Sequence, residues 1–158
     1  MFVVKEQAAP MSPSAVRDAV LRQHVQLRVW LARIEAHAND LMDARGPIGA
    51  LASELSGLRP WLDAHLRFEE ELLFPALAEA DAWAEVRIEH LTRDHAEQRE
   101  HLRTIERILR EPGDGRALAE HVLVLVRSLR ADIDDEDEMA LREGILRDDV
   151  VAIGQSDG

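Results

Sequence analysis

Cysteine and tyrosine are both absent from the 158 residues of this sequence. Without cysteine the chain cannot form disulfides, thiolate metal ligands or iron–sulfur clusters, and without tyrosine it has neither a phenolate ligand nor a tyrosyl radical. Histidine and carboxylate remain as the strong metal ligands. Nitrogen and oxygen donors of this kind suit iron, manganese or zinc, and they do not suit copper(I).

Long apolar runs and positive charge are also scarce. No apolar run approaches the roughly 20 residues that a membrane-spanning helix needs, and the opening segment MFVVKEQAAP is too poor in apolar residues for a secretory signal. We therefore expect a cytoplasmic protein. The formal net charge of −12 disfavours nucleic acid and anionic membranes as partners, because both require basic patches. The sequence identifies no protein partner.

Four segments carry apolar residues at alternating spacings of three and four, over residues 20–41, 51–76, 88–109 and 118–139. Residues in this spacing share one face of a helix, and such faces pack together in a bundle. We predict an all-α fold, an antiparallel up-down-up-down four-helix bundle over residues 14–146. Residues 1–13 are predicted to be a flexible extension and residues 147–158 a tail.

The ends of the helices follow from caps and breakers. We predict helices over residues 14–42, 47–80, 81–110 and 116–143, with short connections near residues 45, 81 and 113. Ser14 and Asp81 are expected to cap the first and third helices, and Gly144 to end the fourth. Pro75 should kink the second helix or end it early.

Each apolar stripe is interrupted near its middle by side chains that can bind metals. These are His24, His65, Glu69, His95, Asp132 and Glu136. Beyond them the stripes continue at Leu72 and Ala76 in the second helix and at Met139 in the fourth. Buried polar groups without partners are costly, and a metal is the simplest common partner. With short loops the six side chains lie within about one helical turn of the same height. We therefore predict that they converge on a metal site.

Each of these residues also has an ordinary interpretation. His24 or His95 alone could be a buried histidine bonded to a carbonyl, and His65 with Glu69 could be a hydrogen-bonded pair on a helix surface. Asp132 and Glu136 lie in the acidic run DIDDEDE, where a solvated face is the usual explanation. Their place on the stripes and their common height favour the metal site. The acidic neighbours off the stripe are expected to face solvent: Asp134, Asp135, Asp137 and Glu138. Gln98, one turn beyond His95, is expected to be a hydrogen-bonding partner near the site.

Two segments resemble the hemerythrin-like (HHE cation-binding) family: HLRFEEELLFPAL at residues 65–77 and TRDHAEQREHL at residues 92–102. The resemblance extends over residues 14–143. It implies an antiparallel four-helix bundle around two non-haem iron ions joined by an oxo or hydroxo bridge, with manganese or zinc as other possible metals. The residues that match the ligand positions of the family are His24, His65, Glu69, His95 and Glu136.

The sequence departs from the family pattern at two positions. Asp132 stands where the pattern has histidine, and Arg99 stands where the oxygen carriers have a further histidine. The aspartate could bind iron directly, bind through a water, or leave a coordination position open. We therefore expect a di-iron protein that binds O2, NO or peroxide for sensing or detoxification, or that binds iron. Two alternatives stay open: a di-iron oxidase or oxygenase with a small organic substrate, and a metal-poor scaffold with a degenerate site. The sequence does not decide whether the protein is an enzyme.

Overall fold

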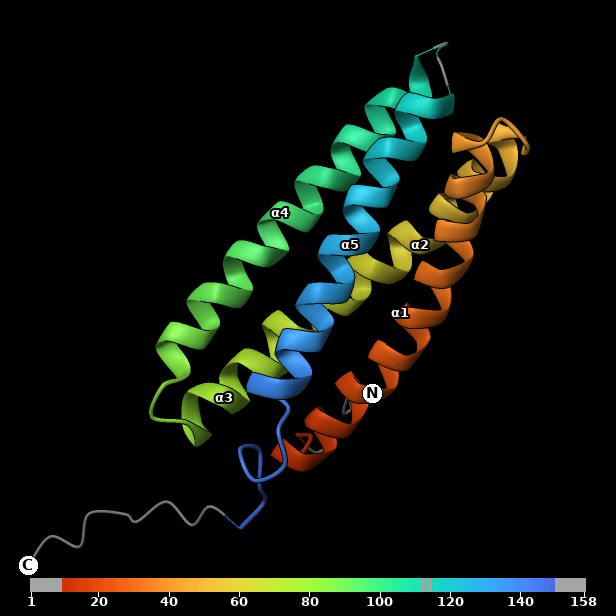
Figure 1. The fold of residues 1–158 in the computed structure, drawn as a ribbon. Coiled ribbons are helices and arrows are strands. Elements are labelled where there is room, and N and C mark those ends of the chain that lie inside the picture. Colours follow the sequence, from red (N-terminus) through yellow and green to blue (C-terminus); the bar gives the residue numbers. More distant parts are fainter. Residues whose placement is uncertain (1–9, 112, 114, 150–158) are drawn as a thin grey trace, which may run out of the picture.

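The computed structural model describes residues 10–111, 113 and 115–149. Its elements are α1 (Pro13–Met42), α2 (Ile48–Phe68), the π-helical turn η1 (Glu69–Leu73), α3 (Phe74–Ala80), α4 (Ala84–Arg110) and α5 (Gly115–Met139). Because α2, η1 and α3 follow one another without a break, they form one arm of a bundle whose other arms are α1, α4 and α5 (Figure 1). Neighbouring arms run in opposite directions, so the predicted four-helix bundle is confirmed.

The core consists of two apolar clusters with a polar layer between them. The larger cluster contains buried side chains such as Leu27, Leu62 and Leu129. The smaller cluster contains Val20 and Leu73 together with residues beyond the end of α5. Between them lie the buried polar side chains, which are His24, His65, Glu69, His95, Gln98 and Glu136. Burial of the apolar side chains on both sides stabilises the bundle and encloses this layer.

The second arm departs from α-helical geometry at Glu69–Leu73, where it forms a π-helical turn. Pro75 lacks a backbone N–H, so an ordinary α-helix would lose a hydrogen bond to residue 71 at this point. The N–H of Phe74 instead donates to the carbonyl of Glu69, five residues earlier. The arm does not end at Pro75, because helical structure continues to Ala80, and a kink there stays a prediction.

The π-helical turn changes which residues point inward. The stripe predicts Leu72 and Ala76 in the core, but the fully buried residues are Leu73 and Leu77, both 0% exposed. Leu72 and Ala76 are only partly buried. A π-helical turn contains one residue more than an α-helical turn, so every later position is shifted by one. The predicted stripe is wrong beyond Glu69 for this reason.

Helix boundaries differ from the predicted ones by a few residues. The N-cap of α1 is Ser12, whose Oγ accepts from the N–H of Ala15 at 3.3 Å, and not Ser14. Helix α4 begins at Ala84, and Asp81 lies before it and accepts from the N–H of Trp83 at 3.1 Å. These shifts are within the usual uncertainty of helix ends.

The fourth arm ends earlier than predicted. Helix α5 stops at Met139 and not at residue 143, and Gly144 adopts a positive φ of 96° in the turn that follows. The chain turns here because Leu141 and Leu146, each 2% exposed, pack into the smaller apolar cluster. Asp148 then accepts hydrogen bonds from the N–H and Oγ of Ser14, at 2.9 and 2.6 Å.

Most of the predicted extension (1–13) and tail (147–158) lies outside the described residues, since residues 1–9 and 150–158 are not described. In the part that is described, none of the helices is both long enough and apolar enough to span a bilayer.

Candidate metal centre

Five of the six predicted ligands meet in the polar layer, and they come from all four arms. They form two groups of possible ligand atoms, each within 4.8 Å: His24, His65 and Glu69, and Glu69, His95 and Glu136. All five side chains are at most 5% exposed. Glu69 belongs to both groups, so it joins them into one cluster.

The carboxylate of Glu69 lies between three imidazoles. Its Oε1 atom is 3.4 Å from Nε2 of His24 and 3.2 Å from Nε2 of His65. Its Oε2 atom is 3.0 Å from Nε2 of His95. The two oxygens therefore face different sets of ligands. A carboxylate in this position suits a pair of cations, because each oxygen is available to a different one.

Glu136 completes the second group from α5. Its Oε2 atom lies 3.1 Å from Nε2 of His24. Glu69 and Glu136 thus contact the same imidazole nitrogen, since Oε1 of Glu69 lies 3.4 Å from that Nε2 atom. Two buried carboxylates around three histidines form a donor set that carries negative charge and consists of nitrogen and oxygen atoms only. Iron, manganese and zinc accept such a set.

Each of the three histidines has an acceptor at the ring nitrogen that faces away from the cluster. The contacts of Nδ1 are Asp137 Oδ1 at 2.7 Å for His24, Gln23 Oε1 at 2.7 Å for His65, and Glu70 Oε1 at 3.0 Å for His95. When Nδ1 carries the proton and donates it to this acceptor, the lone pair of Nε2 points at the cluster. That is the arrangement typical of histidine metal ligands.

Arginines hold two of these acceptors in place. Nη2 of Arg28 donates to Oδ2 of Asp137 at 2.8 Å. Arg99 binds both oxygens of Glu70, at 2.7 and 3.0 Å. Arg99, which stands in place of a further family histidine, therefore acts through Glu70 on the orientation of the His95 ring.

Two aromatic rings stack on the histidines. Trp61 lies on His65 with ring centroids 5.5 Å apart and planes 22° apart. Phe74 lies on His95 at 5.4 Å and 27°. Packing of this kind restricts the rotation of both imidazoles and keeps water from their faces.

Sequence reasoning missed most of this outer layer of hydrogen bonds. Asp137 was expected to face solvent, but its side chain is only 26% exposed and contacts His24. Gln23 and Glu70 were not predicted at all. All three directly follow or precede a candidate ligand in the sequence, which is the feature that could have identified them. They were missed because they lie beside the apolar stripe and not on it.

Several buried polar atoms of the cluster have no hydrogen-bond partner among the described residues: His24 Nε2, Glu69 Oε1, Glu136 Oε2 and Gln98 Oε1. Each such atom costs about 1–3 kcal/mol in a folded protein. The first three converge on one another, so a cation among them would satisfy all three. The residues present therefore fit a metal ion.

The pKa values of the buried carboxyl groups and of His24 also indicate that the cluster holds a positive charge between its carboxylates. Burial and the neighbouring carboxylate of Glu69 raise the pKa of Glu136 to about 7. Burial would also raise the pKa of Glu69, but the adjacent imidazoles of His24 and His95 lower it to about 2. Burial would lower the pKa of His24, but the adjacent carboxylates of Asp137, Glu136 and Glu69 raise it to about 11. A proton on His24 thus occupies the position that a cation would take.

The structure differs from the prediction at Asp132. On the inner face of α5 the position expected for Asp132 is taken by Ile133, which is 3% exposed. The Asp132 carboxylate instead accepts from Nε2 of Gln98 at 2.8 Å and from Oγ of Ser128 at 3.4 Å. Burial, and the charges of Asp94 and Glu97, raise its pKa. Asp132 belongs to neither group of ligand atoms, and its direct ligation stays a prediction.

Gln98 is the expected hydrogen-bonding partner near the site. Its side chain is 3% exposed and donates to Asp132, not to His95. It thereby connects α4 to α5 beside the cluster.

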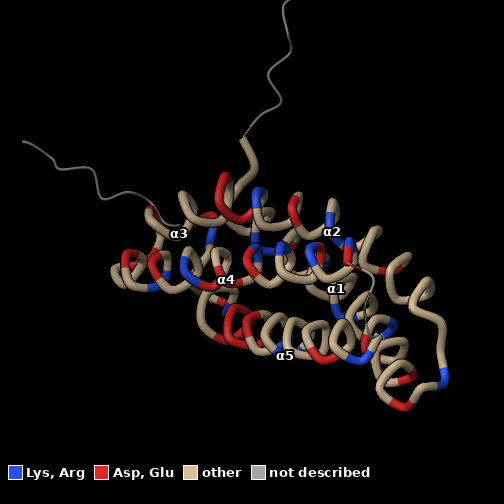
Figure 2. The backbone as a smooth tube through the Cα atoms, turned by 90° about the horizontal axis from the view of Figure 1, so that it is seen from above, with Lys and Arg blue, Asp and Glu red and all other residues tan. Residues whose placement is uncertain are grey.

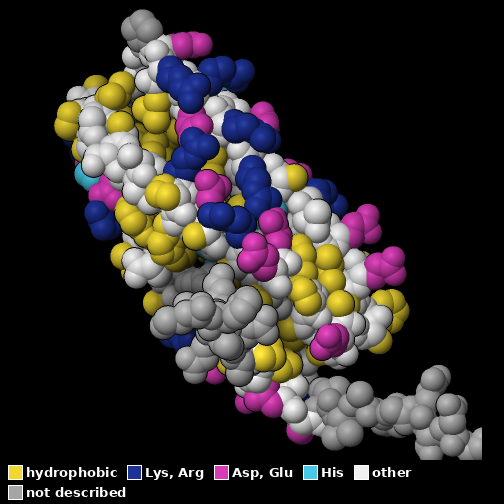
Figure 3. All heavy atoms as spheres, turned by 180° about the vertical axis from the view of Figure 1, so that it is seen from behind, with side chains coloured by type: hydrophobic (Ala, Val, Ile, Leu, Met, Phe, Trp, Pro, Cys, Tyr) yellow, Lys and Arg dark blue, Asp and Glu magenta, His cyan; other side chains and the backbone are white. Residues whose placement is uncertain are grey.

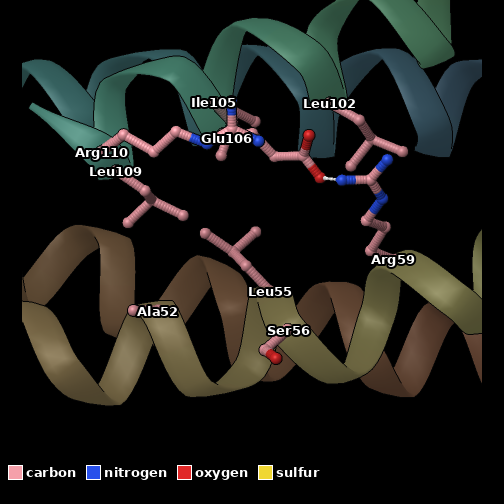
Figure 4. A pocket seen from close by; sticks show the side chains of 9 residues that line it. All are labelled: Ala52, Leu55, Ser56, Arg59, Leu102, Ile105, Glu106, Leu109 and Arg110. Carbon is pink, nitrogen blue, oxygen red and sulfur yellow. Dashed lines mark ion pairs between the residues drawn. The ribbon is translucent and has the colours of Figure 1, made fainter.

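Two of the cavities that the described residues form lie along the arms and bear on the site. The first, of about 370 Å³, lies between α4 and α5, and Glu136 is part of its wall. The second, of about 340 Å³, lies between α2 and α4. In Figure 4, Leu55 and Leu109 point into this second cavity, and Arg59 reaches across it to form an ion pair with Glu106. No candidate ligand lines the second cavity.

Fold and cluster together define a helical-bundle cation-binding domain. The sequence matches the family described as the hemerythrin HHE cation binding domain over residues 15–143. Since the match covers most of the chain, the chain belongs to this family, and the resemblance found in the sequence is confirmed. No curated protein and no solved structure gives a significant match to the chain.

Proposed function

We propose that the protein is a non-haem di-iron protein that binds O2, NO or peroxide for sensing or detoxification. The observation that supports this best is the position of Glu69, with two histidine nitrogens near one carboxylate oxygen and a third near the other. His24, His65, His95, Glu69 and Glu136 would hold the metal. When bound, iron supplies one-electron redox chemistry and open coordination positions for a small ligand.

The residues of the chain prepare the site for this role. Asp137, Gln23 and Glu70 orient the imidazoles through their Nδ1 atoms. The apolar clusters above and below exclude bulk water, which strengthens every electrostatic contact within the layer. A small ligand would thus meet preoriented donors and a dry interior.

Reversible oxygen carriage is not part of the proposal. Two residues depart from the family pattern, and both have other hydrogen-bond partners. Arg99 donates to Glu70, and Asp132 accepts from Gln98. The proposal therefore assigns five protein side chains as metal ligands, and direct ligation by Asp132 stays a prediction. Fewer ligands leave more positions for an added small molecule, which suits sensing or peroxide chemistry.

A second candidate is a di-iron oxidase or oxygenase with a small organic substrate. The cavity between α4 and α5 favours it, because the cavity is about 370 Å³ in volume and Glu136 forms part of its wall. Oxygen consumption that depends on an added organic compound would support this alternative. The third interpretation, a metal-poor scaffold, predicts that the purified protein retains no iron.

Metal analysis of the variant Glu69→Gln tests the proposal. Anaerobic Fe²⁺ should load the parent protein with about two ions per chain, and NO or peroxide should then change its absorption spectrum. Glu69→Gln should lose most of the iron and the spectral change. The neutral amide has only one oxygen, so it cannot offer a ligand atom to both groups as the carboxylate does. The matched control is Glu71→Gln in the same π-helical turn, whose exposed side chain is outside the cluster. Equal iron content in parent and Glu69→Gln would contradict the proposal.

A further inference from the structure

A groove between α4 and α5 has one candidate ligand, Glu136, in its wall. Its wall includes four carboxylates, which are Asp94 on α4 and Asp132, Asp135 and Glu136 on α5. Their exposure falls along the series: Asp135 is exposed, Asp94 and Asp132 are partly buried, and Glu136 is 5% exposed. The groove therefore carries carboxylates that range from exposed to buried, beside apolar side chains such as Met139.

Positive groups in the same groove offset little of this charge. Arg87 lines it, but Nε of Arg87 already donates to Oδ2 of Asp81 at 2.5 Å. His90 lines it as well and is exposed, with Nδ1 at 2.9 Å from Nη2 of Arg93. Nε of Arg93 also lies 3.7 Å from Oδ1 of Asp94, a long contact between partly exposed groups that screens the carboxylate only weakly. The acidic part of α5 is visible near its C-terminal end in Figure 2.

One residue in the wall of the groove, Glu136, also belongs to the buried cluster. Glu136 forms part of the groove wall, and its Oε2 atom lacks a hydrogen-bond partner and lies 3.1 Å from Nε2 of His24. The cavities between α2 and α4 have no candidate ligand in their walls. The face seen from behind carries arginine side chains interspersed with acidic and hydrophobic ones (Figure 3). Of the cavities described here, the groove is thus the one whose wall includes a candidate ligand.

We propose that this groove is the entry route for divalent cations, and that Asp94 and Asp135 attract the ion to Glu136, from which it passes into the cluster. The inference rests on the metal-binding part of the proposed function. A negative, partly enclosed path concentrates cations and raises their association rate by 10- to 1,000-fold, and the effect falls as salt rises. Neutral molecules gain nothing from such charges, and anions are repelled by them.

The double variant Asp94→Asn, Asp135→Asn tests this assignment. Both substitutions preserve side-chain size and remove only charge, and neither residue belongs to the groups of ligand atoms. Co²⁺ is the probe, because its visible absorption reports when the ion acquires nitrogen and oxygen ligands. In stopped-flow mixing at low salt, the association rate should fall about tenfold relative to the parent. The number of Co²⁺ ions bound at saturation should not change. The parent rate should also fall steeply with added salt, and the variant rate only slightly.

The matched control is Glu89→Gln, Glu138→Gln, which removes two charges from the exposed surfaces of the same two helices outside the groove. The control should take up Co²⁺ at nearly the parent rate. Entry through the groove is overturned if the Asn variant keeps the parent rate, or if the control slows as much as the Asn variant does. Saturation of the parent with Co²⁺ is measured in the same experiment and tests metal binding itself, so a failed entry route is distinguished from a failed metal site.

Discussion

Nδ1 of His24 lies 2.7 Å from Oδ1 of Asp137, a residue 113 positions later in the chain. This contact joins the first arm of the bundle to the last. It also determines which nitrogen of the ring faces Glu69 and Glu136. A residue that cannot reach a metal thus controls the direction from which His24 offers its lone pair.

Asp137→Ala should weaken metal binding by about 10- to 100-fold, because the imidazole of His24 loses the acceptor that orients it. Competition with a chelator of known affinity measures the change. Asp134→Ala is the control, since Asp134 shares Arg28 with Asp137 and makes no contact with His24. If both variants bind metal equally well, Asp137 does not position the ligand.

Metal affinity should rise with pH. In the metal-free protein the pKa of His24 is raised to about 11 and that of Glu136 to about 7. Both raised values mean that these groups hold protons at pH values where the free side chains hold fewer, and a cation must displace those protons. At least one proton should be released per cluster at pH 8, and more below pH 7, where Glu136 is also protonated.

Calorimetry in buffers of different ionisation enthalpy counts these protons directly. The logarithm of the affinity should therefore increase by at least about one per pH unit, with a steeper slope below pH 7 than above it. An affinity that is flat between pH 6 and 8 would show that the cation does not replace the proton on His24.

Asp132→His should increase iron retention and give a more hemerythrin-like absorption spectrum, because histidine restores the residue that the family pattern has at this position. Iron content after dialysis and the visible spectrum measure both effects. Asp132→Asn is the control, since it preserves the size of the side chain without adding a metal ligand. If the His variant retains no more iron than the Asn variant, a side chain at position 132 does not reach the metal. The reason would be that Ile133, and not residue 132, lies on the inner face of α5.

Glu136→Met should stabilise the metal-free protein and remove its stabilisation by metal. The carboxylate is 5% exposed and lies close to a second one, so the folded state is penalised for keeping it ionised above pH 7. Removal of a carboxyl group whose pKa is raised in the folded state relieves this penalty, which is on the order of 1–3 kcal/mol. Thermal unfolding with and without Co²⁺ measures both effects, and exposed Glu138→Met should change neither.

Much of the fold follows from the apolar periodicity alone. Residues spaced by three and four defined four arms, and the ligands on those stripes converged because short connections force neighbouring arms to be antiparallel. His24, His65, Glu69, His95 and Glu136 could all be placed in this way. The stripe also explains the one exception, since Asp132 and Ile133 occupy the three- and four-residue steps after Leu129 and the apolar side chain takes the core.

What could not be predicted depends on contacts between distant parts of the chain. Helix α5 ends at Met139, after which Leu141 and Leu146 pack onto the smaller apolar cluster. The sequence near residue 139 contains no capping residue that would predict this end. The orientation of Asp137 depends on Arg28, which lies on another arm. Periodicity describes one helix at a time and therefore contains no information about such pairs.

The π-helical turn at Glu69–Leu73 also has a consequence for insertions and deletions in this arm. A π-helical turn is equivalent to an α-helix into which a single residue has been inserted. Deletion of one residue between Glu70 and Leu73 would restore an α-helix, in which the present Leu73 and Leu77 follow Glu69 at the three- and seven-residue steps of the stripe. Both side chains, which are fully buried, would therefore keep facing the core. EEELL is thus a segment in which the arm can lose one residue without changing which later side chains are buried.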